Sequence, residues 1–156
     1  EPLSQSPPEQ LFKWRTAFFE SHIKPIILPA GQKLISEHKA RGDDLLIITA
    51  TNHFVTQPIA EHLGINELIA TLPEKKDGLY TGNFTGVPSF QEGKITRLDE
   101  WLLEKGKHLD GAYFYSDSHN DLPLLRKVDV PIAVDPDPIL QKEAEDNGWK
   151  IISLRS

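Results

Sequence analysis

Apolar residues recur along the chain in two patterns. Short apolar runs of strand length lie at 44–50, 67–72, 112–116, 131–134 and 150–154. Between them, apolar residues recur every three or four positions, as on one face of a helix. These helical stretches lie at 8–23, 30–40, 52–63, 91–105, 120–128 and 138–148. Apolar strands that alternate with helices predict an α/β fold whose parallel sheet is covered by helices on both faces.

Glycine and proline mark where these elements end. Gly42 and Gly64 follow two of the helical stretches, as expected of residues that terminate helices. The Asp77-Gly78 pair predicts the turn of a small hairpin that lies outside the main sheet. Pro25 and Pro29 interrupt the chain around Ile26–Leu28 and indicate a domain boundary there.

The composition bounds the kind of protein. A chain of 156 residues with 38% hydrophobic and 26% charged residues is typical of one globular domain, and no apolar run approaches membrane-spanning length. The net charge of -6 argues against a nucleic-acid partner, since phosphate backbones favour basic surfaces. The absence of cysteine is compatible with a reducing compartment, so we expect a cytoplasmic protein with no membrane partner.

Polar residues stand where predicted strands end. Thr49 closes the run LLII, Asp117 directly follows YFYS, and Asp121 comes one short turn later. Lys94 lies near the start of a predicted helix, from which its ammonium group can reach the same edge. Ligands of open parallel sheets bind beyond the carboxyl ends of the strands. The pattern therefore predicts that these side chains lie near one another.

The chemistry of this set suits a metal ion and a phosphate group. Two carboxylates such as Asp117 and Asp121 favour Mg²⁺, which keeps few protein ligands and completes its shell with water and phosphate oxygens. Thr49 and Lys94 would bind the remaining phosphate oxygens, and Asn120 could add a donor. Taken alone, Asp117 and Asp121 could instead cap the helix that follows.

At these positions the sequence resembles the haloacid dehalogenase superfamily of phosphohydrolases, in the phosphoserine phosphatase-like branch with a helical cap. LLIITAT resembles the second family motif and QEGK the third, which correspond to Thr49 and Lys94. Thr51 is the less favoured candidate for the second motif. YSDSHNDLPLL resembles the fourth motif, which corresponds to Asp117, Asn120 and Asp121. The resemblance implies a magnesium-dependent phosphatase that acts on a small phosphorylated metabolite.

The resemblance also implies an architecture. It predicts a three-layer α/β sandwich of the Rossmann type, with residues 1–28 as the remnant of a helical cap and 29–156 as an incomplete core. The first family motif, Asp-x-Asp-x-Thr after a strand, supplies the nucleophile and the acid-base. Nothing here matches it, because Asp43 and Asp44 follow no strand. We therefore expect a segment upstream of Glu1 to supply this motif.

The missing segment has a structural consequence. In the family the first strand is central and lies between the strands that here carry Thr49 and Asp117. Without it, backbone donors and acceptors would be left unpaired in a buried place. We therefore expect that residues 1–156 do not fold alone and are inactive alone.

Other functions remain open on the sequence. If this chain is the complete product, a non-catalytic protein that binds phosphate and metal is the better hypothesis. Phosphoserine is doubtful as the substrate, since Ala50-Thr51-Asn52 stand where phosphoserine phosphatases usually have glycines. A dinucleotide-binding fold is disfavoured, because no G-x-G-x-x-G follows a strand. A two-component receiver is also disfavoured, because its acidic residues precede the Thr and the Lys.

Overall fold

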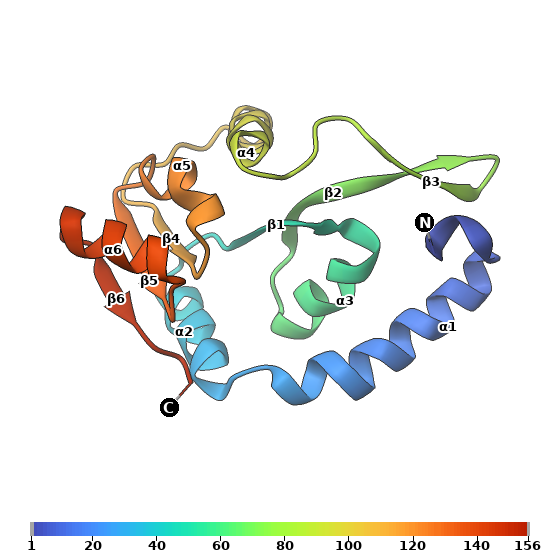
Figure 1. Ribbon diagram of the computed structural model, residues 1–156, viewed down its shortest axis with the longest axis horizontal. Helices are drawn as coiled ribbons and strands as arrows, with labels where there is room; N and C mark the ends of the chain where they lie inside the picture. Colours follow the sequence, from blue (N-terminus) through green and yellow to red (C-terminus); the bar gives the residue numbers. More distant parts are fainter. Residues whose placement is uncertain (1, 156) are drawn as a thin grey trace. The chain divides into compact units, whose positions relative to one another are not determined.

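A computed structural model describes residues 2–155 (Figure 1). It divides into two compact units, of which the first ends at Ser89 and the second begins at Phe90. The predicted division into a cap remnant, 1–28, and a core, 29–156, distinguishes domains by family role and not by compactness, and it stays a prediction. No helix within residues 2–155 is long and apolar enough to cross a membrane.

Helical segments form the start of the first unit and recur at 53–63. They are η1 (Pro2–Gln5), α1 (Pro8–Phe18), the π-helical turn η2 (Phe19–Ile23), η3 (Lys24–Ile26), α2 (Pro29–Ala40) and α3 (His53–Leu63). Proline suits the first turn of α1 and of α2, where an amide hydrogen has no intrahelical partner. Gly64 ends α3 with φ of 66°, a left-handed conformation that glycine adopts readily. The predicted helix at 8–23 is therefore helical throughout, but its last turn is wider than an α-helix.

The sheet of the first unit has three strands in the order β1-β2-β3. β1 (Leu46–Asn52) is parallel to β2 (Glu67–Lys76), and β2 is antiparallel to β3 (Leu79–Thr85). Asp77 and Gly78 form the predicted turn, both with positive φ. The hairpin extends β2 beyond the part that pairs with β1, and it can be followed in Figure 1. Within residues 2–155, β1 pairs with a strand on one side only.

The buried cluster of the first unit joins three of its elements. Leu11 of α1, Phe54 of α3 and Tyr80 of β3 pack together. The Phe54 and Tyr80 rings lie 5.6 Å apart in an edge-to-face arrangement. The guanidinium of Arg15 lies 4.6 Å from the Phe54 ring centroid and donates a hydrogen bond to the Phe54 carbonyl. The hairpin is thereby fixed against the helices of its own unit.

The second unit is a three-stranded parallel sheet with helices. Its elements are α4 (Glu92–Lys105), β4 (Tyr113–Ser116), η4 (His119–Asp121), α5 (Leu122–Leu125), β5 (Val130–Val134), α6 (Pro138–Asn147) and β6 (Lys150–Ile152). The strand order is β4-β5-β6, so β4 pairs on one side only within residues 2–155. Leu125, Ala133, Leu140 and Ala144 form its fully buried core. The prediction of an α/β fold with parallel strands is confirmed, although the helix expected at 120–128 ends at Leu125.

Candidate active site

The centre of the candidate site is a buried ion pair in the second unit. Lys94, in the first turn of α4, lies with its Nζ 2.6 Å from Oδ1 of Asp121. Ser116, the last residue of β4, donates a hydrogen bond of 2.6 Å from its Oγ to Oδ2 of Asp121. Only 8% of the surface of each of the three residues is exposed. Both oxygens of the Asp121 carboxylate are thus engaged.

Asp117 contrasts with Asp121. It follows β4 directly and is exposed, whereas Ser116 beside it is buried, as expected from the alternation of side chains along a strand. The Asp117 carboxylate makes no hydrogen bond or ion pair with any other residue of 2–155. Its backbone carbonyl accepts a hydrogen bond of 2.9 Å from the amide of Asp137. The loop is therefore anchored while the carboxylate stays available to a ligand.

Short local hydrogen bonds shape the loop between β4 and α5. The Ser118 amide donates to Ser116 Oγ over 3.2 Å, and the Asn120 amide donates to Ser118 Oγ over 3.2 Å. The Asn120 Oδ1 accepts a hydrogen bond of 3.4 Å from Gln91 Nε2. These serine-mediated turns hold Asp121 and Asn120 in place at the end of the strand.

Asp137, which precedes α6, braces the same loop from behind. Its Oδ1 accepts from the Leu140 amide and caps α6, and its Oδ2 accepts from the amide and the ring of His119. Burial raises the pKa of the Asp137 carboxyl, but the hydrogen bonds from Leu140 and His119 outweigh it and lower the pKa to about 2. Asp137 is therefore ionised at neutral pH and ties the Asp117 loop to the start of α6.

Thr49 lies in the other unit, near the end of β1. It is half-buried, and its Oγ1 accepts a hydrogen bond of 3.1 Å from the Thr51 amide. Thr51 itself is exposed. The structure thus brings Lys94 into contact with Asp121 and places Asp117 and Asn120 in one loop, whereas the role of Thr49 stays a prediction.

The metal-binding capacity of these residues can be judged from their donors. No group of three or more His, Cys, Asp or Glu side chains that could hold an ion occurs within residues 2–155. Mg²⁺ does not require one, because one or two carboxylates plus water and phosphate oxygens complete its shell. Asp117 has two available oxygens of the hard type that Mg²⁺ prefers. Asp121 is already bound by Lys94 and Ser116, so it fits a supporting role better than that of a direct ligand.

Comparison with known proteins decides the family. The family model for haloacid dehalogenase-like hydrolases matches residues 2–126. The chain belongs to this family. The matched residues include the candidate residues Thr49, Lys94, Asp117, Asn120 and Asp121. The predicted identification as a member of the haloacid dehalogenase superfamily is confirmed.

Named relatives and a solved structure that are similar to this chain support the same family. A histidinol-phosphatase of Neisseria meningitidis is 44% identical over 158 residues, which cover 99% of this chain and 71% of that protein. Phosphoserine phosphatase SerB1 of Mycobacterium tuberculosis is 32% identical over 88% of this chain and 44% of its own length. A crystal structure of a protein of unknown function from Bordetella pertussis Tohama I superposes with a TM-score of 0.95 at 44% identity, covering 97% of this chain and 70% of that one. The predicted classes, a phosphoric monoester hydrolase and a haloacid dehalogenase-like fold, are confirmed.

The chain spans only part of these relatives, and less than half of the mycobacterial one. Sequence reasoning did not find Ser116 or Asp137, which hold Asp121 and the Asp117 loop. The role of Ser116 could have been found from strand alternation, because the residue before an outward-facing Asp117 is expected to face inward. Asp137 only precedes the helical stretch predicted at 138–148, and nothing local signals its contact with His119, which spans 18 residues.

Proposed function

We propose that the intact protein is a magnesium-dependent phosphatase that hydrolyses a small phosphomonoester. The observation that carries this proposal is the buried Lys94–Asp121 pair with the exposed, unpaired carboxylate of Asp117 in the adjoining loop. Such a site offers a fixed positive charge and an available hard ligand. That combination suits a phosphate group that is bridged to a divalent cation.

Each residue has a role in this proposal. Asp117 would hold Mg²⁺, which when bound supplies positive charge to the phosphate oxygens. Asp121 orients Lys94 and, through it, the phosphate. The Lys94 ammonium and the Thr49 hydroxyl bind phosphate oxygens, and Asn120 adds an amide donor. Together they stabilise the negative charge that builds up on the oxygens of the phosphoryl group during transfer.

The nucleophile in this proposal is an aspartate in a segment upstream of Glu1. Its attack on phosphorus would form an aspartyl-phosphate and release the alcohol, and water would then hydrolyse the acyl-phosphate bond. The one-sided pairing of β1 and of β4 supports this proposal, because each edge can accept one more strand. A non-catalytic phosphate- and metal-binding role is the alternative if no such segment exists. A cytoplasmic location stays a prediction.

Histidinol phosphate is the first substrate to test, because the Neisseria relative is named a histidinol-phosphatase. The experiment is a phosphate-release assay on the intact protein with histidinol phosphate, phosphoserine and glycerol 3-phosphate, with and without Mg²⁺. We expect turnover that needs Mg²⁺ and falls by roughly 100-fold or more in Asp117→Asn. Asp110→Asn is the matched control, since its side chain is 95% exposed and lies in the same unit. Full activity of Asp117→Asn would refute the metal assignment.

A further inference from the structure

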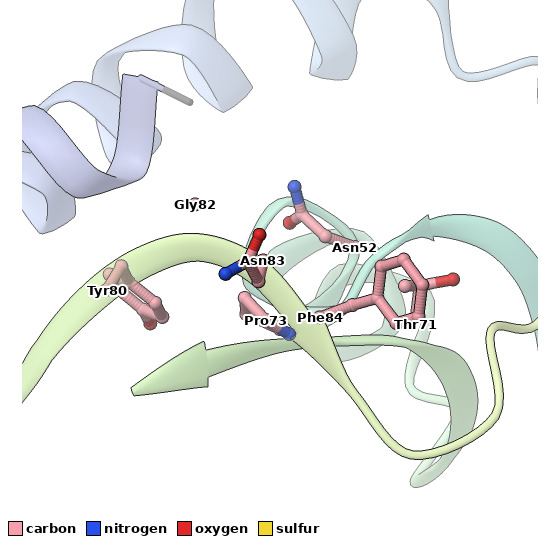
Figure 2. Close-up of a pocket in the computed structure, with 7 residues that line it drawn as sticks. All are labelled: Asn52, Thr71, Pro73, Tyr80, Gly82, Asn83 and Phe84. Atoms are coloured by element: carbon pink, nitrogen blue, oxygen red, sulfur yellow. The ribbon is translucent and has the colours of Figure 1, made fainter. Parts of the chain in front are cut away.

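A pocket of about 160 Å³ lies in the first unit, between the end of β1 and the β2–β3 hairpin. Figure 2 shows the residues that line it, which are Asn52, Thr71, Pro73, Tyr80, Gly82, Asn83 and Phe84. The volume is below the roughly 300 Å³ at which pockets for drug-sized ligands begin. The pocket therefore suits a small group such as a single ring.

The polar groups of the pocket differ in what they leave available. The Thr71 hydroxyl is used internally, since it donates to the Ala50 carbonyl and accepts from the Ser89 amide. The Oδ1 of Asn52 accepts from the Val55 amide, while its amino group makes no hydrogen bond within residues 2–155. The Asn83 side-chain amide likewise has no partner within that range. An amide donor and a complete amide group are thus open to a ligand.

The lining of the pocket includes two aromatic rings and no charged side chain. Figure 2 shows the rings of Tyr80 and Phe84, both from β3, together with the amide side chains of Asn52 and Asn83. None of the lining residues carries a formal charge at neutral pH. An ammonium group would meet no counter-charge in this lining and would lie near the Lys75 ammonium, which is 4.7 Å from the Tyr80 ring centroid, so its desolvation would be unfavourable. A neutral flat ring with one hydrogen-bond donor and one acceptor matches both the rings and the amides.

We infer that this pocket, which we call the hairpin pocket, binds the leaving group of the substrate and selects a neutral heteroaromatic ring of the imidazole class. The inference rests on the proposed function. Asn52 stands three residues after Thr49 on β1, whose register shifts between Ile48 and Asn52, so at ~3.3 Å per residue the two residues are at most about 10 Å apart. A short linker could thus join a phosphate group bound at Thr49 to a ring bound in the hairpin pocket. The imidazole of histidinol phosphate is such a ring, whereas phosphoserine has no ring to place in the pocket.

Phe84→Ala tests the inference, with Leu79→Ala as the matched control. Both residues lie on β3 and are similarly exposed, 55% and 53%, but only Phe84 lines the hairpin pocket. For the intact protein with Mg²⁺, we expect Phe84→Ala to raise KM for histidinol phosphate roughly five- to tenfold, the size of one lost ring contact, with kcat unchanged. KM for glycerol 3-phosphate, which has no ring, should not change, and Leu79→Ala should resemble the parent protein for both esters.

A binding measurement separates this inference from the proposed function. Histidinol, the alcohol without phosphate, is titrated into the ¹⁵N-labelled intact protein. We expect shifts of the Gly82 and Asn83 amide signals that are lost in Phe84→Ala, whether or not any ester is hydrolysed. Shifts confined to other residues, or an equal KM increase for glycerol 3-phosphate in Phe84→Ala, would overturn the inference. Absence of hydrolysis together with the expected shifts would instead refute the proposed function alone.

Discussion

Lys94 and Asp121, 27 residues apart in the sequence, form a buried ion pair with 2.6 Å between Nζ and Oδ1. The pair joins the first turn of α4 to the loop that follows β4. Ser116 donates a hydrogen bond to the second oxygen of the Asp121 carboxylate, so the carboxylate has a fixed orientation. A buried charge with all its partners in place is tolerated, whereas a buried charge that has lost its partner is costly. The pair should therefore matter to folding as well as to catalysis.

Removing one partner tests both roles at once. We expect Lys94→Met to lower the free energy of unfolding of the intact protein by about 3 kcal/mol, because the Asp121 carboxylate is left buried without its cation. Phosphatase activity should also disappear. Urea denaturation and phosphate release on the same samples measure the two effects.

The double variant Lys94→Met/Asp121→Leu separates them. It removes the uncompensated charge, so we expect most of the lost stability to return while activity stays absent. Recovery of activity in the double variant would mean that Lys94 does not bind phosphate and that the pair is only structural.

A second prediction concerns the threonine that is proposed to bind phosphate. Thr49 is half-buried near the end of β1, and Thr51 is exposed two residues later. We expect Thr49→Val to reduce kcat/KM by roughly 100-fold, the usual effect of losing one donor to transition-state charge. Thr49→Ser should retain most activity because it keeps the hydroxyl. If Thr51→Val is the more damaging change, Thr51 rather than Thr49 is the phosphate ligand.

The sequence predicted the elements of the fold well because its signals were local. Gly64 ends α3, as its position after a helical stretch predicted, and Asp77-Gly78 forms the expected turn. The width of the last turn of the first helix, Phe19–Ile23, was not predictable. It depends on packing, such as the edge-to-face contact of Phe19 with His62, rather than on the order of apolar residues.

The site was predicted as a set of residues but not as a set of contacts. The motifs placed Lys94, Asp117 and Asp121 at strand and helix ends, and the second unit has them there. The sequence could not tell which carboxylate Lys94 would pair with, since that depends on the path of a loop. Ser118 caps the short turn that contains Asp121, and in this loop Asp121 is buried while Asp117 is exposed.

The edges of the two sheets give a third prediction. β1 and β4 each pair on one side only within residues 2–155. If an upstream strand completes them, a polypeptide of residues 1–156 alone should unfold without cooperativity and exchange the amides of β1 and β4 rapidly. A polypeptide that includes the upstream segment should protect the same amides by at least about 100-fold more. Cooperative unfolding of residues 1–156 with strong protection at both edges would contradict the need for that strand.

The last prediction follows from the lowered pKa of Asp137. Burial raises this pKa, but the hydrogen bonds from Leu140 and His119 lower it to about 2, against an ordinary value near 4. The folded state therefore binds the proton less well than the unfolded chain does. This stabilisation is fully present above about pH 4 and is lost as the pH falls toward 2. Asp137→Asn removes it but keeps a side chain that can cap α6.

We expect Asp137→Asn to lower the free energy of unfolding of the intact protein by about 1–2 kcal/mol at pH 7, after allowance for a side chain that is 31% exposed. The difference from the parent protein should shrink steadily between pH 4 and pH 2. Denaturation curves at a series of pH values measure it, with Asp110→Asn as a control that should show little difference at any pH, because Asp110 is almost fully exposed. A deficit that stayed constant down to pH 2 would mean that Asp137 acts through shape rather than charge. The Asp137 carboxylate accepts a hydrogen bond from the His119 amide, and the Asp137 amide donates one to the Asp117 carbonyl. If the charge of Asp137 positions the Asp117 loop, Asp137→Asn should therefore also weaken the affinity for Mg²⁺, measured as the Mg²⁺ concentration that gives half-maximal activity.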